Sequence, residues 1–380
     1  SKTTSVPNSS NATSSDKTEV TETVKSENVA TDHSAAETAS NDNANISLES
    51  ETGFEQRFQR IAVGESFNAA TVFGNGVSNV KVINSNIASA SGTTITAKAF
   101  GRTQVVGTVN GEMSIIELEV RTSSSDVAAP MVAAGGGHTV ALKKDGTVWT
   151  WGNNGVGQLG DGTSVTKAYP VQVFAGEEND SSTGYLNNII QISAGSNYVM
   201  ALKKDGTVFT WGQNIYGQLG NGSSVNSMLP VQVKSTDGNS FLTDVVQISA
   251  GYVHSMALKK DGTVWTWGRN DGGQLGNNNT SNKSLPVQVK GGASGSEYLT
   301  DVVQVTAGNW HSMALKANGT VYAWGWGQYG QLGNGYTTNR NDTDYYSSEK
   351  IYSAPVQVLN GEQTSETGYL KEVVQIDAMG

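Results

Sequence analysis

A glycine-rich stretch, Gly155-Val-Gly157-Gln-Leu-Gly160, has the G-x-G-x-x-G spacing of loops that bind nucleotide phosphates. In such loops the backbone N–H groups approach the phosphate at the N-terminus of a helix. The chemistry therefore requires a helix after the glycines. Beyond Gly160 the sequence has no helix-period segment and continues into the strand-like Pro-Val-Gln-Val at Pro170. We interpret the motif as a coincidence and expect no cofactor.

Three histidines could act as metal ligands or as general acids and bases. His138, His254 and His311 occupy the same position in separate copies of a repeated segment, and Tyr198 takes that position in the remaining copy. A shared position indicates a shared structural role, such as a hydrogen bond from the ring to neighbouring backbone. We therefore expect no metal site and no catalytic residue among them.

The repeated segment occurs four times, at intervals of 56 to 60 residues. Each copy contains an Ala-Leu run, Asp-Gly or Asn-Gly, a Trp-Gly pair, G-Q-L-G and P-V-Q-V. The first glycine of the nucleotide-like motif occurs in one copy alone, whereas G-Q-L-G occurs in all four, so these glycines serve the repeat. The Trp-Gly pairs begin at Trp151, Trp211, Trp267 and Trp324.

Each copy predicts four short strands, and the corner between the second and third strands carries the strongest local signal. Asp-Gly favours a type I′ turn, in which both central residues have positive φ. Asp145, Asp205 and Asp261 are then corner residues rather than a catalytic carboxylate pair. One such sheet cannot bury both of its faces, so the copies must stack as propeller blades. We expect the repeated tryptophans to pack between blades.

The repeat resembles the RCC1 (regulator of chromosome condensation) family, which has the same order of A-G-x-x-H-S-x-A-L, D-G-x-V-x-x-W-G, G-Q-L-G and P-V-x-V. The resemblance covers residues 127–380 and implies an all-β fold of RCC1-type β-propeller blades. That family usually forms seven blades. Four full repeats and the start of a fifth predict an incomplete ring, a ring closed by association, or a fragment of a longer protein.

Two regions of different composition precede the repeats. Residues 1–52 are acidic and rich in Ser, Thr and Asn, which predicts a disordered spacer. Residues 53–123 alternate with period 2, which predicts a small β-sandwich. The stretch from Ser85-Asn86-Ile87-Ala88 onward resembles bacterial immunoglobulin-like domains of group 2, although Ala90 replaces the usual Val and a usual Trp is absent. In that family the domain serves as an extracellular spacer or adhesive module.

Composition excludes several classes of function. The chain of 380 residues has no Cys, which rules out disulfides, thiolate metal sites and cysteine nucleophiles. Its formal net charge of -10 repels phosphate backbones, so we expect no nucleic-acid partner. No apolar run reaches the length of a membrane span, so we expect no membrane insertion within this chain.

Positions that differ between the copies are candidates for binding, because the repeated positions hold the scaffold. The copies carry different side chains, several of them aromatic, beside the Trp-Gly pair, before G-Q-L-G and before the repeated histidine. The connector Gly333–Pro355 is also longer than its counterparts. The candidate partner contacts are Tyr216, Arg269, Trp310, Trp326, Tyr329, Tyr345 and Tyr346.

These observations favour a non-catalytic bacterial protein, secreted or on the cell surface, whose blades bind a protein or a cell-wall or host-surface ligand such as a glycan. Two alternatives stay open. The RCC1 resemblance implies guanine-nucleotide exchange on a small GTPase, but we disfavour this partner because no wedge-like insertion is evident and the charge opposes chromatin binding. The chain could also be an accessory region of a larger enzyme or adhesin.

Overall fold

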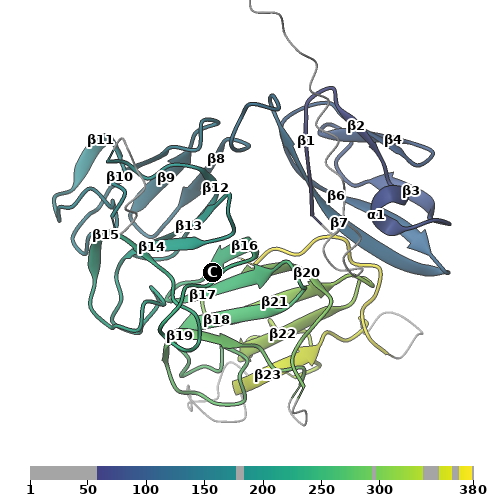
Figure 1. Cartoon of the computed structure of the whole chain (residues 1–380). Coiled ribbons are helices and arrows are strands. Elements are labelled where there is room, and N and C mark those ends of the chain that lie inside the picture. The colour runs from purple at the N-terminus through teal and green to yellow at the C-terminus, as the bar shows by residue number, and fades with distance from the viewer. Residues whose placement is uncertain (1–57, 177–183, 293–296, 337–350, 362–367, 379–380) are drawn as a thin grey trace, which may run out of the picture. The chain divides into compact units, whose positions relative to one another are not determined.

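The computed structural model describes residues 58–176, 184–292, 297–336, 351–361 and 368–378 (Figure 1). All of them belong to one compact unit, residues 51–380. The predicted disordered spacer, residues 1–52, lies outside the described residues, as do Tyr345 and Tyr346.

The first described region forms two sheets, with strand orders β1-β7-β6-β3 and β2-β5-β4. Ile116, Leu118 and Val120 alternate along β7 as predicted, and they pack with Ile95 in the core between the sheets. In the described part of the chain, no helix is both long and apolar enough to span a membrane. The elements are β1 (Phe58–Ala62), β2 (Ser66–Asn68), α1 (Ala70–Phe73), β3 (Ser78–Val82), β4 (Ala88–Ser91), β5 (Thr94–Ala97), β6 (Gly101–Val109) and β7 (Glu112–Arg121).

Four antiparallel sheets of four strands follow, one for each repeat, which confirms the predicted all-β blades. The first blade contains β8 (Met131–Ala134), β9 (His138–Leu142), β10 (Val148–Gly152) and β11 (Lys167–Gln172). The second contains β12 (Ile189–Ala194), β13 (Tyr198–Lys203), β14 (Val208–Gly212) and β15 (Ser227–Gln232). The third contains β16 (Val245–Ala250), β17 (His254–Lys259), β18 (Val264–Gly268) and β19 (Lys283–Gln288). The fourth contains β20 (Val302–Ala307), β21 (His311–Lys316), β22 (Val321–Trp326) and β23 (Ile351–Gln357).

The corner between the second and third strands is not the type I′ turn that the sequence predicts. In the first blade Gly146 has φ of +79°, whereas Asp145 is not among the residues with positive φ. The Gly146 N–H donates to the Lys143 carbonyl oxygen, and the Thr147 N–H donates to Asp145 Oδ1 at 3.0 Å. This side-chain bond holds the aspartate inside a three-residue loop, so only the glycine needs a positive φ. Asp145 is a corner residue, as predicted.

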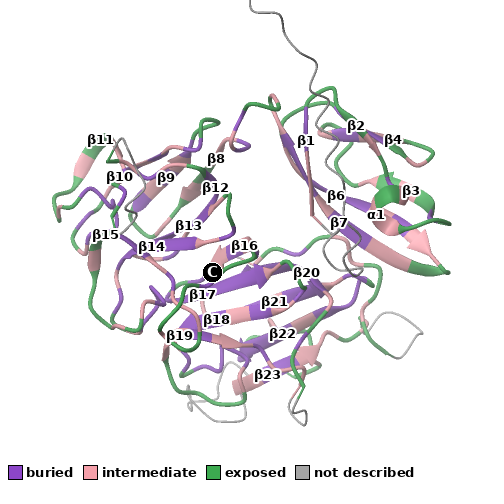
Figure 2. Ribbon diagram, viewed as in Figure 1, coloured by how far each residue is buried: buried purple, intermediate pink, exposed green. Residues whose placement is uncertain are grey.

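Neighbouring blades meet at a repeated hydrogen bond, and we call each such contact a seam. At each seam the indole N–H of the later blade's Trp donates to the carbonyl oxygen of the earlier blade's G-Q-L-G glutamine. Figure 2 shows the buried residues that run through the middle strands of the blades. The inter-blade role predicted for the tryptophans is thus confirmed at three seams. The bonds run from Trp211 to Gln158, from Trp267 to Gln218 and from Trp324 to Gln274, at 3.0, 2.9 and 3.0 Å.

The first strands of successive blades also contact one another. In the second, third and fourth blades a glutamine side chain in this strand accepts a backbone N–H from the segment that follows the blade. The segment after the fourth blade continues this pattern, because its Ile376 N–H donates to the fourth blade's glutamine. The bonds run from Ile248 to Gln191, from Val305 to Gln247 and from Ile376 to Gln304, at 3.0, 2.8 and 2.9 Å.

Candidate interaction surface

The loop with the nucleotide-like glycines is a closed turn rather than a phosphate site. The Leu159 N–H donates to Asn154 Oδ1 at 2.9 Å, and the Gly157 N–H donates to the Asn154 carbonyl oxygen at 3.0 Å. Gly160 has φ of +66°, and a Cβ there would lie 2.9 Å from Trp211 Nε1. The next regular element is strand β11 rather than a helix. The glycine therefore lets the loop approach the next blade's indole, as the repeat comparison predicts.

One of the repeated histidines, His254, bonds to the next blade, and its partner differs from the backbone partner predicted. His254 Nε2 lies 2.9 Å from Ser312 Oγ of the next blade, so the ring bonds to a side chain and not to backbone. Ser312 Oγ in turn donates to the Gln274 carbonyl oxygen at 2.9 Å. Burial, helped by the nearby His311, lowers the pKa of His254 to about 3, and burial lowers the pKa of His138 to about 4. Among the described residues no group of three His, Asp or Glu could hold a metal.

Arg269 is the centre of an aromatic group that spans three blades. Its guanidinium lies 4.8 Å from the ring centre of Tyr216 and 4.2 Å from that of Trp310. Asp271 holds it from the side, with Arg269 Nε donating to Oδ1 at 2.7 Å and an Nη donating to Oδ2 at 2.6 Å. The arginine is therefore fixed between two rings, and its charge is balanced within the group.

The aromatic group continues into the fourth blade. The rings of Trp310 and Trp326 lie 6.1 Å apart at 63°, and those of Trp326 and Tyr329 lie 5.6 Å apart at 70°. These are edge-to-face arrangements, which the charge distribution of aromatic rings favours. Trp326 is buried, whereas Tyr329 is 66% exposed. We call Tyr216, Arg269, Trp310, Trp326 and Tyr329 the aromatic patch.

Two loops of each blade position the aromatic patch. One loop precedes the second strand and the other follows the third, and a backbone hydrogen bond joins them at the same end of the blade. In the third blade the Arg269 N–H donates to the Val253 carbonyl oxygen at 3.1 Å. In the fourth blade the Trp326 N–H donates to the Trp310 carbonyl oxygen at 2.9 Å. In the first blade the equivalent bond joins Asn153 to Gly137, so the same frame carries no aromatic ring there.

The structure thus brings together five of the seven predicted contact residues. The sequence comparison missed Asp271, which holds Arg269 and is visible only once the guanidinium is placed. It also missed two exposed apolar residues on the same loops, Ile215 and Tyr252, which are 55% and 45% exposed. Both differ between copies, since Gly155 stands in the first blade where Ile215 stands in the second. A search for loop positions that differ between the copies and carry a large apolar side chain would have identified both residues.

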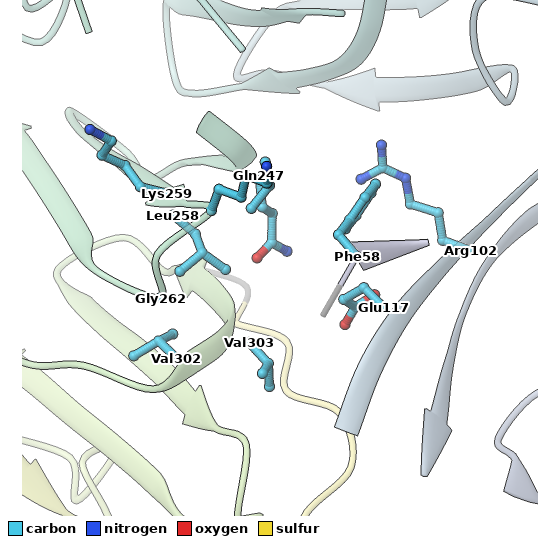
Figure 3. A pocket seen from close by; sticks show the side chains of 11 residues that line it. Phe58, Arg102, Glu117, Gln247, Leu258, Lys259, Gly262, Val302 and Val303 are labelled. Atoms are coloured by element: carbon cyan, nitrogen blue, oxygen red, sulfur yellow. The ribbon is translucent and has the colours of Figure 1, made fainter. Parts of the chain in front are cut away.

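A cavity elsewhere in the compact unit is shown in Figure 3, lined by Phe58, Arg102 and Glu117 and by blade residues that include Val302. Gln104 Nε2 donates to Glu117 Oε1 at 2.9 Å. Burial raises the pKa of the Glu117 carboxyl to about 7. The described lining supplies one carboxyl, the basic side chains of Arg102, Lys259 and Lys260, and aliphatic side chains, without a second carboxyl and without Ser, Thr or His. We assign this cavity to packing rather than to chemistry.

Comparisons with known proteins agree with this description of the blades. A family model described as the RCC1-like domain matches residues 98–377. The human E3 ubiquitin-protein ligase HERC2 is 36% identical over 217 residues, which are 56% of this chain and 4% of that protein. The ultraviolet-B receptor UVR8 of Arabidopsis thaliana is 33% identical over 248 residues, which are 64% of this chain and 52% of that protein. The chain therefore spans about half or less of these relatives.

Solved structures are also similar to this chain, at lower sequence identity. The structure of human WBSCR16 matches with a TM-score of 0.50 and 20% identity, covering 73% of this chain and 67% of that one. A structure of Prp20p from Saccharomyces cerevisiae, described together with its binding to Gsp1p and histones, matches with a TM-score of 0.48 and 22% identity. That match covers 68% of this chain and 62% of the other.

Proposed function

The chain belongs to the RCC1-like domain family, and from this premise we propose that it is a non-catalytic binding scaffold whose aromatic patch contacts a partner protein. One observation carries the proposal. Side chains that vary between repeats, and that come from three different blades, meet in a single connected group centred on Arg269. The indole hydrogen bonds at the seams, by contrast, repeat from blade to blade. The residues that hold the blades together therefore differ from those that form the patch.

The chemistry of the aromatic patch fits a protein partner. Trp, Tyr and Arg are the residues most enriched where protein interfaces concentrate their binding energy. Asp271 and the two flanking rings hold Arg269 in place, so little side-chain entropy is lost on binding. The edge-to-face rings do not lie in one plane, whereas a neutral sugar stacks on a flat ring face. This geometry favours a protein over a glycan as the partner.

The proposed setting is outside a bacterial cell, in a secreted or surface-displayed protein. The acidic, Ser/Thr-rich first 52 residues would act as a stalk, and residues 53–123, which resemble a bacterial immunoglobulin-like domain, would act as a spacer. The absence of cysteine is compatible with this setting, and the acidic, Ser/Thr-rich composition fits it. Detection of the native protein in culture medium or on intact cells would test it, and recovery from the cell interior alone would contradict it.

The binding proposal is tested with one exposed tyrosine inside the patch and one outside it. Tyr329 is 66% exposed and Tyr169, on the first blade, is 82% exposed. The immobilised chain is presented with solubilised host-surface proteins and, separately, with cell-wall glycans. We expect Tyr329→Ala to weaken capture of a protein ligand at least tenfold and Tyr169→Ala to leave it unchanged. Equal loss in both variants, or capture of glycans alone, would contradict the proposal.

The exchange-factor alternative is tested separately. The sequence-based expectation against a small GTPase partner gains no support from the comparisons, so this partner stays open. Release of labelled guanine nucleotide from a panel of small GTPases, with and without the chain, is the measurement. If small amounts of the chain accelerate nucleotide release from one of these GTPases, the chain is an exchange factor and the scaffold proposal is wrong. An accessory role in a larger enzyme or adhesin is compatible with the same surface.

A further inference from the structure

One lysine position is used differently in the first and third blades. Lys167 pairs with Gly152 across strands β10 and β11, and Lys283 pairs with Gly268 in the same register of β18 and β19. In the first blade Lys167 Nζ lies 3.5 Å from the Oδ2 of Asp161, which directly follows G-Q-L-G. The ammonium group there has an internal counter-ion.

In the third blade an amide replaces that counter-ion. Asn277 follows G-Q-L-G where the first blade has Asp161, so the carboxylate beside the lysine is lost. Both residues accept a bond from the same loop asparagine, with Asn154 Nδ2 3.1 Å from Asp161 Oδ1 and Asn270 Nδ2 3.1 Å from Asn277 Oδ1. The two sites therefore share one local geometry and differ in charge.

The orientation of the Asn277 amide determines whether the third-blade site presents a donor or an acceptor beside Lys283. Asn277 Oδ1 accepts from Asn270 as Asp161 Oδ1 accepts from Asn154, so by this equivalence Asn277 Nδ2 corresponds to Asp161 Oδ2 of the first blade. Two donors, this amide and the Lys283 ammonium, thus replace a donor and an acceptor. Within the described ranges no carboxylate pairs with Lys283, and no acceptor lies on Asn277 Nδ2. Such a pair of donors is suited to an external anion.

Both donors line a hollow of about 290 Å³ on the third blade. Two aromatic side chains, Trp265 and Tyr298, line it as well, and the Lys290 ammonium lies 4.1 Å from the ring centre of Tyr298. Among the residues that the structure describes, none that lines the hollow is acidic. The hollow thus combines positive charge, amide donors and apolar ring surface, in a chain whose net charge is negative.

We propose that this hollow binds a carboxylate-bearing sugar of an acidic glycan. The sugar carboxylate accepts from Lys283 Nζ and Asn277 Nδ2, while the sugar ring packs against Trp265 and Tyr298. The two donors favour a negatively charged ligand, and the aromatic side chains favour a ligand with a sugar ring over a small inorganic anion. The site shares no residue with the aromatic patch, so this proposal can be tested independently of the proposed protein partner.

The test is calorimetric titration of the full chain with hyaluronan tetrasaccharide, whose glucuronate units carry carboxylates. Neutral chitotetraose and inorganic sulfate serve as separate titrants. We expect binding of the acidic tetrasaccharide alone, and at least a tenfold loss of affinity in Lys283→Ala. Asn277→Asp should cause a similar loss, because it rebuilds the internal ion pair of the first blade without removing the lysine. Equal binding of chitotetraose, or of sulfate, would overturn the assignment to an acidic sugar.

Lys167→Ala is the matched control, since it removes the equivalent lysine from the blade that keeps its counter-ion. This variant should bind the tetrasaccharide like the parent chain. Thermal unfolding of each variant distinguishes a lost site from a lost fold, and Asn277→Asp should unfold at or above the parent's temperature because it gains an ion pair. Unchanged affinity in a folded Asn277→Asp variant would refute the proposal.

Discussion

The seam between the third and fourth blades has a more extensive hydrogen-bond network than the seam between the first and second. At the third–fourth seam Trp324 Nε1 and Ser312 Oγ both donate to the Gln274 carbonyl oxygen, at 3.0 and 2.9 Å. Ser312 Oγ also lies 2.9 Å from His254 Nε2. One serine thus links the ring of one blade to the loop that meets the next blade's indole.

At the first–second seam that serine is replaced by Val199. Trp211 still donates to the Gln158 carbonyl oxygen at 3.0 Å. The ring nitrogens of the buried His138, which correspond to those of His254, have no hydrogen-bond partner among the described residues. The indole bond is therefore common to the three seams, whereas the serine–histidine pair belongs to the third–fourth seam. At the second–third seam Ser255 Oγ donates to the Tyr198 hydroxyl instead.

The largest expected effect comes from breaking the common bond. Trp267 is fully buried at the second–third seam, where its indole N–H donates to the Gln218 carbonyl oxygen. We expect Trp267→Ala to destabilise the chain by about 3–5 kcal/mol, because it leaves a large cavity at the seam and removes the indole hydrogen bond. The urea concentration at the midpoint of unfolding measures this loss.

Trp151 is the control for that prediction, because it occupies the same repeat position in the first blade but is only half-buried. No seam bond involves its indole within the described residues. Trp151→Ala should therefore shift the midpoint much less than Trp267→Ala. Equal shifts would mean that the tryptophans stabilise their own blades and not the seams.

The next effect is a loss of stability in acid. Burial holds His254 neutral in the folded chain, with its pKa lowered from 6.5 to about 3. The unfolded chain takes up a proton as the pH falls below about 6.5, so this contribution is present above that pH and is lost on the way towards pH 3. At pH 5 we expect it to have cost about 2 kcal/mol relative to pH 7. Urea unfolding at several pH values measures the slope.

The contribution of Glu117 to stability changes with pH in the opposite direction to that of His254, so the two contributions must be measured separately. Burial raises the pKa of its carboxyl from 4.5 to about 7, so its contribution is complete below pH 4.5 and is lost as the pH rises towards 7. The variant Glu117→Gln removes this opposing term. Stability should then fall more steeply between pH 6.5 and 4.5, and an unchanged slope would contradict the assignment.

The sequence predicted the frame of the blades far better than the surface built on it. Four aligned copies are enough to identify the strands, the tryptophans at the seams, and the glycines that belong to the loops of the repeat. A residue type that recurs at the same position in every copy meets the same local geometry each time. The type I′ turn was wrong because the Asp145 side chain bonds to Thr147, a contact that the Asp-Gly pair alone does not reveal. The histidine partner was wrong because Ser312 belongs to another blade.

The aromatic patch shows the same limit. Variation between copies selected Tyr216, Trp310 and Tyr329 as candidates, but one repeat cannot show that loops of separate blades meet at Arg269. Asp271 was compared only as a substitute for a glycine, and its ion pair with Arg269 gives it a role. Proximity between blades depends on stacking, which a pattern within each copy does not contain.

The smallest expected effect comes from giving the first–second seam the missing serine. Val199→Ser places a hydroxyl where Ser312 lies in the fourth blade, within reach of the Gln158 carbonyl oxygen and the His138 ring. Two new hydrogen bonds of about 1 kcal/mol each would offset the loss of about 1.5 kcal/mol of apolar burial. We therefore expect stability within about 1 kcal/mol of the parent. Val199→Ala, which loses the methyl groups without gaining bonds, should be clearly less stable than Val199→Ser. If the alanine variant is as stable as the serine variant, the seams differ in more than this one residue.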